Sequence, residues 1–255
     1  MKVTVLGCGS SGGVPLIGGN WGKCDPNEPR NRRRRVSILV EDDETRLLVD
    51  TSPDLREQLL DAGVSRLDAV LYTHAHADHL HGIDDLRGLN RAMRRPIPVY
   101  ASETTLDEIS ARFAYVFRPI PESHGFYKPV LIPNRIDGPF RIGSIPVVPI
   151  DQDHGFTRSL GFRFGGIAYS TDVVELDEAA FAALAGVKIW IVDCVRTESH
   201  PTHSHLAKTL GWIARLKPER AILTHMDAGL DYAKLKRELP PGVEPGYDGL
   251  VAETL

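Results

Sequence analysis

The chain has 255 residues, 42% of them hydrophobic and 25% charged, and its formal net charge is −4. This length can bury a sizeable core, and we expect one domain over residues 1–255. The charge gives no general basic surface, which argues against nucleic acid as the main partner. No stretch approaches ~18 uninterrupted apolar residues, so we expect no transmembrane helix.

The strands are predicted from short apolar runs rich in β-branched residues, each of which ends at Gly, Pro, Asp or Ser. In chain order these runs occupy residues 2–7, 37–42, 45–51, 67–74, 97–102, 143–151, 160–166, 166–172, 187–194 and 220–225. Helical patterns occupy 52–63, 175–186, 203–217 and 231–239, the first with Ser52 as N-cap and Pro53 at its first position. This order predicts two sheets covered outside by helices.

Two segments have no role assigned from the sequence. Residues 30–35, RNRRRR, form a basic run, which is usually a solvated face; the alternative is a site for an anionic ligand or RNA. Residues 112–139 are rich in Pro and aromatic side chains, and we interpret them as an insertion that overhangs a site, with His124 as a candidate lid residue.

The compartment is expected to be the cytoplasm. The first residues, MKVTVLGCGSSGG, lack the apolar core and cleavage site of a secretory signal. Cys8, Cys24 and Cys194 are scattered without a CxxC pair. An odd, sparse count of this kind argues against a disulfide framework and fits a reducing environment.

The densest group of ionisable residues follows the apolar run at 67–72. It reads THAHADH and places His74, His76, Asp78 and His79 within six positions. Imidazole and carboxylate together suit zinc, manganese or iron. Four such residues exceed what one tetrahedral ion needs from one loop, so some of them can face a second ion a few ångströms away.

A paired-metal site needs further ligands at the ends of later strands, and three candidates occur there. His154 ends the run VVPIDQDH, Asp172 ends IAYSTD, and His225 ends AILTH. Any one of them alone would be read as an ordinary loop residue. Together with the four-residue cluster they predict a metal site.

The cluster THAHADH, followed in order by His154, Asp172 and His225, resembles the metallo-β-lactamase superfamily over nearly the whole chain. The resemblance implies an αββα sandwich with two divalent ions, zinc or manganese, at one edge of the sheets. One ion would take His74, His76 and His154, the other Asp78, His79 and His225, and Asp172 would bridge them. It also implies that Asp50, in LLVDTSPD, orients the ligand loop. His rather than Glu at position 76 favours a hydrolytic over a redox site.

Two further stretches bear on the substrate. The turn after the first strand contains Ser10, Ser11 and Gly12, whose backbone N–H groups could cradle phosphate oxygens; the alternative is a tight strand-to-loop connection. His203 and His205 stand at or just before a helix start, where the alternative is a cap or a surface histidine.

These stretches, with residues 18–35 and the terminal PGYDGL, resemble the phosphodiesterase branch of the PhnP family. In that pattern a histidine in the place of His203 is a general acid or a substrate ligand, while His205 departs from an aspartate. We take His203 and Asp78 as candidate catalytic residues and expect Asp193 to support the site. The branch also carries a cysteine zinc site, but Cys24 alone cannot close one, so we expect none here.

The sequence therefore predicts a dinuclear metal-dependent phosphodiesterase for a small cyclic phosphodiester or a nucleotide-like phosphate ester. LGCGSSGGVP is also similar to tRNase Z, whose long tRNA-gripping arm is not evident, so an RNA substrate stays open. Thioester, lactone or β-lactam hydrolysis is the rival on the same fold, and a non-catalytic nucleotide-binding protein is the rival of another class. The oligomeric state is not determined, and a dimer is compatible with the sequence.

Overall fold

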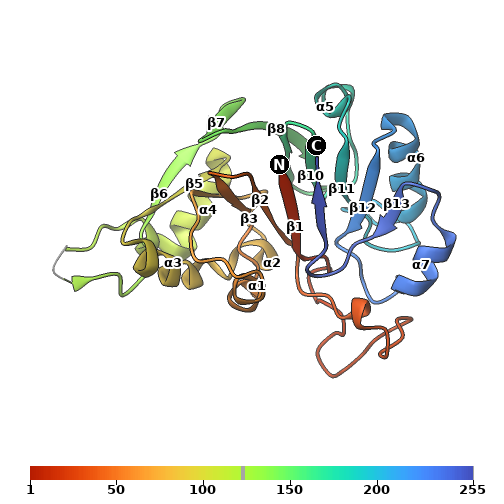
Figure 1. Ribbon diagram of the computed structural model, residues 1–255, viewed down its shortest axis with the longest axis horizontal. Helices are drawn as coiled ribbons and strands as arrows, with labels where there is room; N and C mark the ends of the chain where they lie inside the picture. Colours follow the sequence, from red (N-terminus) through yellow and green to blue (C-terminus); the bar gives the residue numbers. More distant parts are fainter. Residues whose placement is uncertain (122–123, 255) are drawn as a thin grey trace.

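The computed structural model describes residues 1–121 and 124–254, which form two facing seven-stranded sheets with helices outside (Figure 1). The first sheet has the order β14 (Val251–Glu253), β1 (Lys2–Gly7), β2 (Ser37–Glu41), β3 (Arg46–Val49), β4 (Ala69–Leu71), β5 (Ile97–Ala101), β6 (Leu131–Arg135). The second has the order β13 (Val243–Pro245), β12 (Arg220–Thr224), β11 (Ile189–Asp193), β10 (Ile167–Ser170), β9 (Arg158–Phe164), β8 (Ile145–Asp153), β7 (Phe140–Ile142). This arrangement is the αββα sandwich of the metallo-β-lactamase type, as predicted.

The helices flank the two sheets on opposite sides in Figure 1. On one side lie α1 (Leu55–Asp61), α2 (Ala77–Leu80), α3 (Leu86–Met93) and α4 (Glu103–Phe113); on the other lie α5 (Glu178–Leu184), α6 (Leu206–Leu216) and α7 (Tyr232–Glu238). Short 3-10 turns span Pro29–Asn31, Ile83–Asp85 and Ala114–Phe117. None of the helices in the described ranges is long and apolar enough to cross a membrane.

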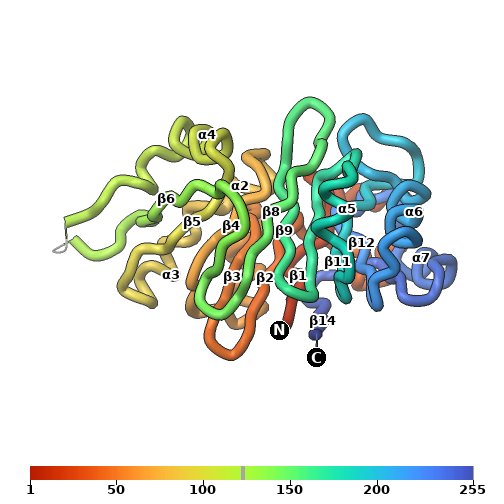
Figure 2. Tube along the Cα trace, turned by 90° about the horizontal axis from the view of Figure 1, so that it is seen from above, coloured from red at the N-terminus to blue at the C-terminus, as the bar shows by residue number. Residues whose placement is uncertain are grey.

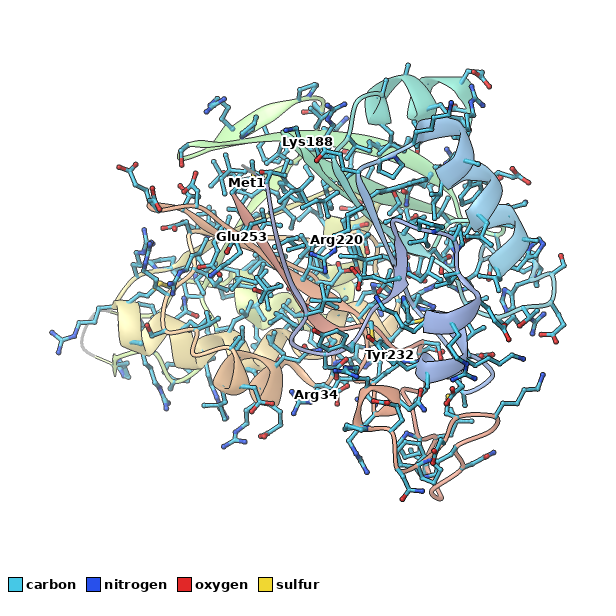
Figure 3. All side chains as sticks on the ribbon, turned by 45° about the vertical axis from the view of Figure 1, so that its right-hand side comes forward. Met1, Arg34, Lys188, Arg220, Tyr232 and Glu253 are labelled. Carbon is cyan, nitrogen blue, oxygen red and sulfur yellow. The ribbon has the colours of Figure 1, made fainter. Side chains whose placement is uncertain are left out.

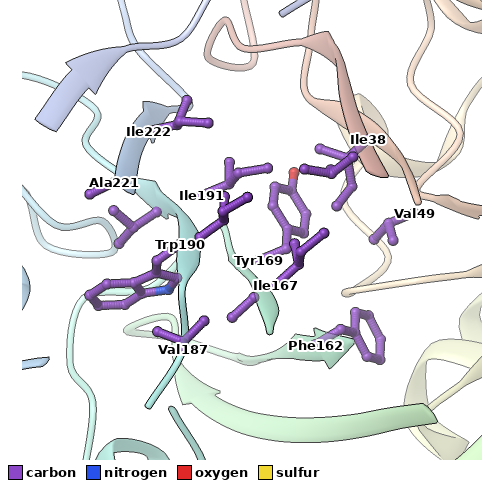
Figure 4. Close-up of a cluster of buried hydrophobic side chains, with 14 of the residues drawn as sticks. Ile38, Val49, Phe162, Ile167, Tyr169, Val187, Trp190, Ile191, Ala221 and Ile222 are labelled. Atoms are coloured by element: carbon purple, nitrogen blue, oxygen red, sulfur yellow. The ribbon is translucent and has the colours of Figure 1, made fainter. Parts of the chain in front are cut away.

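The main core fills the space between the sheets. Alternate residues of β1 to β3 point inward, for example Val3, Ile38 and Val49, and they meet Phe162 and Tyr169 from the second sheet. Figure 4 shows Ile38 and Val49 on one side of this core and Phe162, Ile167 and Tyr169 on the other. A second cluster packs the outer face of the first sheet under α1 to α4. Because both faces of the first sheet are buried, its strands consist of nearly continuous runs of apolar residues.

The strand ends that matter for function share one edge. β10, β11 and β12 are parallel to one another, and β4 is parallel to β3. Parallel strands bring their carboxyl ends to the same side of a sheet, which places the residues after Ser170 and Thr224 together in the second sheet. The residues after Leu71 come from the facing first sheet and meet them across the sandwich, as the contact of His74 with Asp172 shows. Figure 2 shows α4, the β8–β9 turn and the segment before α6 along one side of the molecule, at the top of the view.

The first predicted helix begins later than expected. Ser52 was expected to be the N-cap, but α1 starts at Leu55 and its N-cap position is Asp54. The Ser52 hydroxyl oxygen instead accepts a hydrogen bond from the Asp54 N–H at 3.1 Å, in a turn before the helix. The Ser-Pro pair therefore forms a lead-in turn to the helix.

The interpretation of residues 30–35 as a solvated face is wrong for its centre. Arg33 is 2% exposed and donates to the carbonyl oxygens of Asp227 and Leu230 at 3.2 and 2.6 Å. Arg30 instead lies over the rings of Tyr232 and Tyr247. The run therefore fastens the N-terminal loop to the C-terminal part of the chain, where Figure 3 labels Arg34 and Tyr232.

β14 pairs with β1 in the register Lys2 to Glu253, which places the two ends of the chain side by side. Figure 3 labels Met1 and Glu253 at this edge. A half-buried carboxyl group, Asp248, accepts hydrogen bonds from the N–H groups of Cys8 and Arg34 at 3.3 and 2.8 Å. These contacts connect the last residues to the turn that follows β1.

Candidate metal centre

The loop after β4 carries the first part of the site. His74 is buried and His76 is exposed, and α2 then starts at Ala77, so that Asp78 and His79 lie in its first turn. The His74 and His76 rings are 4.4 Å apart and the His74 and His79 rings 4.3 Å apart. Asp78 and His79 therefore project from the start of a helix. β4 itself ends at Leu71, so the two earlier histidines stand on a loop.

Asp172 lies at the centre of the site, two residues after the end of β10. Its Oδ2 is 3.7 Å from Nε2 of His74 and 3.5 Å from Nε2 of His154. Nε2 of His154 is in turn 3.3 Å from Nδ1 of His76. These three imidazoles and one carboxylate oxygen converge as a single donor group.

The other oxygen of Asp172 faces a separate group of donors. Its Oδ1 is 3.1 Å from Nε2 of His79 and 3.5 Å from Nε2 of His225. Both of those nitrogens lie 3.4–3.5 Å from Oδ2 of Asp78. The seven residues predicted as ligands are therefore brought together in two groups of three, with one oxygen of Asp172 turned toward each group.

Asp50 holds one of these groups in place. It is fully buried at the end of β3, and its Oδ2 is 2.7 Å from Nδ1 of His79. Its carboxylate also accepts from the Thr73 N–H and hydroxyl, both at 2.8 Å. A carboxylate on Nδ1 fixes the tautomer in which Nε2 is free to bind a metal, so the geometry suits the predicted orienting role.

The backbone at the site is strained. Asp50, Asp172 and His225 adopt positive φ values of 64°, 52° and 58°, a region that non-glycine residues seldom occupy. Such conformations persist where surrounding contacts determine them, and they cluster at functional sites. Asp50 and His225 come directly after a strand and Asp172 two residues after one, where the turn sends each side chain toward the site.

The charges of the site are strongly coupled. Burial favours a neutral carboxyl group at Asp172, but His225, His79 and His74 outweigh it and hold the pKa of Asp172 well below its usual range. Burial likewise opposes a charged His225, yet Asp172 and Asp78 raise its pKa to about 9. At His74 burial prevails and lowers the pKa well below the usual value, which leaves a neutral imidazole.

The donor set fits a pair of divalent ions. Nε2 of His74, His79 and His225 is buried and has no hydrogen-bond partner within the described residues. Buried polar atoms are rarely left without a partner unless an ion or a water completes them. Mixed imidazole and carboxylate donors accept zinc, manganese or iron. The site can therefore hold metal, and its donor chemistry does not choose among these three.

His203 lies against the same site, and its imidazole converges with Asp172 and His225 as a third group of possible donors. Its Nδ1 is 3.1 Å from Oδ2 of Asp193, which is fully buried at the end of β11. Its Nε2 is 3.7 Å from Oδ2 of Asp172. Asp193 thus holds His203 with Nε2 toward the site, in the supporting position expected for it.

The Gly/Ser-rich turn reaches the site through one residue. Ser11 lines the cavity over the ligands, a space of about 380 Å³. Ser10 is buried, and its N–H donates to the Met226 carbonyl oxygen at 3.1 Å, so that group is not free. Ser11 and Gly12 are exposed, and their N–H groups have no backbone acceptor in the part of the chain that the structure describes.

Other predicted histidines lie outside this cavity. His205 occupies the N-cap position of α6 and makes no side-chain capping hydrogen bond. His124 lines a different cavity with Arg91, Arg94 and Tyr127, so the structure does not place it over the ligands. In the segment 112–139, Leu131–Arg135 forms strand β6, and residues 122–123 lie outside the described residues.

The sequence did not single out two contributors to the site. The Thr202 carbonyl oxygen accepts from His154 Nδ1 at 2.7 Å and fixes that ring. Phe156, in the β8–β9 turn, lines the cavity beside His203. Only the proximity of Phe156 to the ligand His154 in the chain could have drawn attention to it.

A family model described as the β-lactamase superfamily domain matches residues 45–226, the span from β3 to the residue after His225. The chain belongs to the β-lactamase superfamily. The crystal structure of a protein described as a new diphosphatase from the PhnP family superposes on this chain with a TM-score of 0.91. The two sequences are 34% identical, and the superposition covers 100% of this chain and 98% of the diphosphatase chain. The resemblance to the PhnP family is thereby confirmed.

Two curated proteins are also similar to this chain, but each alignment covers only about half of the curated protein. An octanoyltransferase from Porphyromonas gingivalis is 34% identical over 258 residues, 99% of this chain but 51% of that protein. A ribonuclease Z from a Bradyrhizobium species is 31% identical over 144 residues, 53% of this chain and 46% of that protein. The chain thus spans about half the length of the curated relatives it matches.

Proposed function

We propose that this chain is a dinuclear metal-dependent phosphodiesterase that acts on a small cyclic phosphodiester or a nucleotide-like phosphate ester. The observation that carries the proposal is Asp172, whose two carboxylate oxygens face two separate groups of donors. A single ion would not need donors on both sides of one carboxylate. The PhnP-family neighbour, at 34% identity over the full chain, supports a phosphate-containing substrate.

The ligand assignment follows the two donor groups. His74, His76 and His154 would hold one ion. Asp78, His79 and His225 would hold the other, with Asp172 between them. Two divalent ions bound in this way supply hydroxide at neutral pH and polarise an oxygen of the substrate.

The remaining work falls to residues around the ions. The N–H group of Ser11, which lines the cavity, has no backbone acceptor within the described residues, and neither has that of its neighbour Gly12. These groups can donate to phosphate oxygens, because backbone N–H groups of such turns form anion-binding concavities. His203 can hold a proton at Nε2 and give it to the departing alkoxide oxygen, since Asp193 fixes its ring through Nδ1. Asp78 would contribute through its carboxylate as a ligand of the ion that His79 and His225 also hold.

A second candidate function is hydrolysis of a diphosphate bond. The PhnP-family neighbour is described as a diphosphatase, and its structure matches nearly all of both chains. Both reactions place a phosphate oxygen between the two donor groups and release an oxygen leaving group. They differ in the acidity of that leaving group, because a phosphate leaves more easily than an alkoxide.

A panel of substrates tests the proposal. Zinc- and manganese-loaded protein should hydrolyse a ribose cyclic phosphodiester or bis(4-nitrophenyl) phosphate, and a chelator should abolish the activity. A dinucleoside diphosphate, a thioester and a lactone serve as comparisons. Faster hydrolysis of the diphosphate than of every diester would favour the second candidate. Turnover confined to the thioester or lactone would contradict both.

A further inference from the structure

The cavity over the candidate metal centre has one apolar element. Apart from Phe156, its lining consists of polar or ionisable residues: Ser11, His76, Asp78, Glu108, His154, Thr157, Asp172, Thr202, His203 and His225. The Phe156 ring is 92% exposed, and none of the ring pairs within the described residues includes it. An aromatic ring therefore stands uncovered beside the space where the substrate would bind.

The turn that carries Phe156 is held in place. Gly155 has a φ of +76°, and a Cβ there would lie 2.8 Å from the Pro201 carbonyl oxygen, so the turn packs tightly against the loop before α6. The Gly155 N–H also donates to Oδ1 of Asp153 at 2.7 Å. His154 is fixed to the Thr202 carbonyl oxygen, and its N–H donates across the turn to the Thr157 carbonyl oxygen at 3.0 Å. The backbone on both sides of Phe156 is therefore restrained.

An exposed ring in this position gains free energy when a ligand covers it. Full burial of a phenylalanine side chain is favourable, and a planar partner adds stacking to that gain. Bases stack on aromatic side chains with little regard to their identity, because every base has a π-face. A single exposed apolar residue needs no explanation on an ordinary surface, but this one lines a cavity that is otherwise polar.

We propose that Phe156 is a specificity-determining residue that stacks on a planar aromatic group of the substrate, so that the substrate class is a phosphate ester carrying a nucleobase or similar ring. This inference rests on the proposed function, since it requires a phosphate group at the metal centre. It narrows that function from phosphate esters in general to those with a ring within reach of the β8–β9 turn.

Equilibrium binding of two monoesters to the zinc-loaded protein tests this directly. AMP and ribose 5-phosphate share the sugar phosphate and differ only in the adenine, so the ratio of their dissociation constants isolates the ring. We expect AMP to bind about 5- to 100-fold more tightly. Phe156→Leu should remove most of that preference, and Phe156→Trp should retain it. Tyr127→Leu changes an exposed aromatic side chain in a different cavity and should leave the ratio unchanged.

The outcomes separate this inference from the proposal beneath it. If both ligands bind wild-type protein equally, or if Phe156→Leu keeps the preference, the stacking assignment is wrong and the phosphate site stands. If neither ligand binds while zinc is bound, the proposed function fails and the inference fails with it. Because Phe156 is exposed, the variants should fold normally, which unchanged melting temperatures would verify.

Discussion

Replacing His203 separates proton donation from metal binding. Its Nδ1 is held by Asp193 at 3.1 Å, and its Nε2 lies 3.7 Å from Oδ2 of Asp172, so the ring can reach a leaving group above the ligands. General acid catalysis typically contributes ~10²–10⁴-fold, or about 2.7–5.5 kcal/mol of barrier. His203→Ala should therefore slow hydrolysis of an alkyl phosphodiester by that factor.

The structure also limits the cost to folding. Without the imidazole, Oδ2 of Asp193 still accepts from the N–H groups of Val173 and Ser204 at 3.1 and 3.3 Å. Losing one of three partners at a buried carboxylate should lower the free energy of unfolding by about 1–3 kcal/mol. His203→Asn can keep a donor to Asp193 without a titratable proton, so it should be more stable than the alanine variant and just as slow.

The assay compares two diesters on the same variants. An alkoxide needs a proton to leave and a nitrophenolate hardly does, so the rate loss should be large for the alkyl ester and small for the nitrophenyl ester. Metal content should stay at the wild-type value, and His81→Ala, at an exposed position, is the matched control. Equal losses on both esters with metal retained would refute proton donation, and loss of metal would refute the ligand assignment.

Three further predictions concern Asp50 and Cys24, which are buried, and Asp248, which is half-buried. Asp50→Asn removes the carboxylate from His79 Nδ1 and should weaken metal binding by about 10- to 100-fold, measured by competition with a chromogenic chelator. Burial raises the pKa of Asp248 to about 7, so its stabilising effect is complete below pH ~4 and is lost as pH rises toward 7. Asn does not titrate, so the free energy of unfolding of Asp248→Asn, measured with urea, should rise by about 1–3 kcal/mol relative to wild type as the pH goes from 5 to 8. A difference between the two proteins that does not change with pH would contradict this. Cys24→Ser should leave metal content unchanged and cost about 1 kcal/mol in unfolding, because Cys24 packs only in a small cluster with Val14 and Ala228; loss of one zinc would reveal an unrecognised ligand set.

The sequence predicted the strands better than the helices on the first sheet. The run at 2–7 became β1 with the same bounds, because its apolar residues are continuous and end at a glycine. Two helices, α3 and α4, were not predicted. Only Thr105 and Ile109 of α4 are buried, so its apolar stripe is too narrow to show a helical period. Ser102, whose hydroxyl accepts from the Thr105 N–H, was the local signal that marked its start.

The site was predictable where its residues follow strands. Asp172 comes two residues after β10 and His225 directly after β12, and parallel strands of one sheet bring such residues to one edge. Contacts between loops could not be read in the same way. The pairing of His154 with the Thr202 carbonyl oxygen, and the place of Phe156 on the cavity wall, depend on how two turns pack in three dimensions. No spacing along the chain encodes that packing.

Metal stoichiometry tests the central claim most directly. The purified protein is saturated with zinc or manganese, and excess metal is removed by gel filtration. Inductively coupled plasma mass spectrometry should then find about two metal ions per chain. Asp172→Ala should lower that number and abolish phosphodiester hydrolysis, because each oxygen of Asp172 faces one group of donors. A wild-type protein that never binds more than one ion per chain under saturating conditions would contradict the two-ion account.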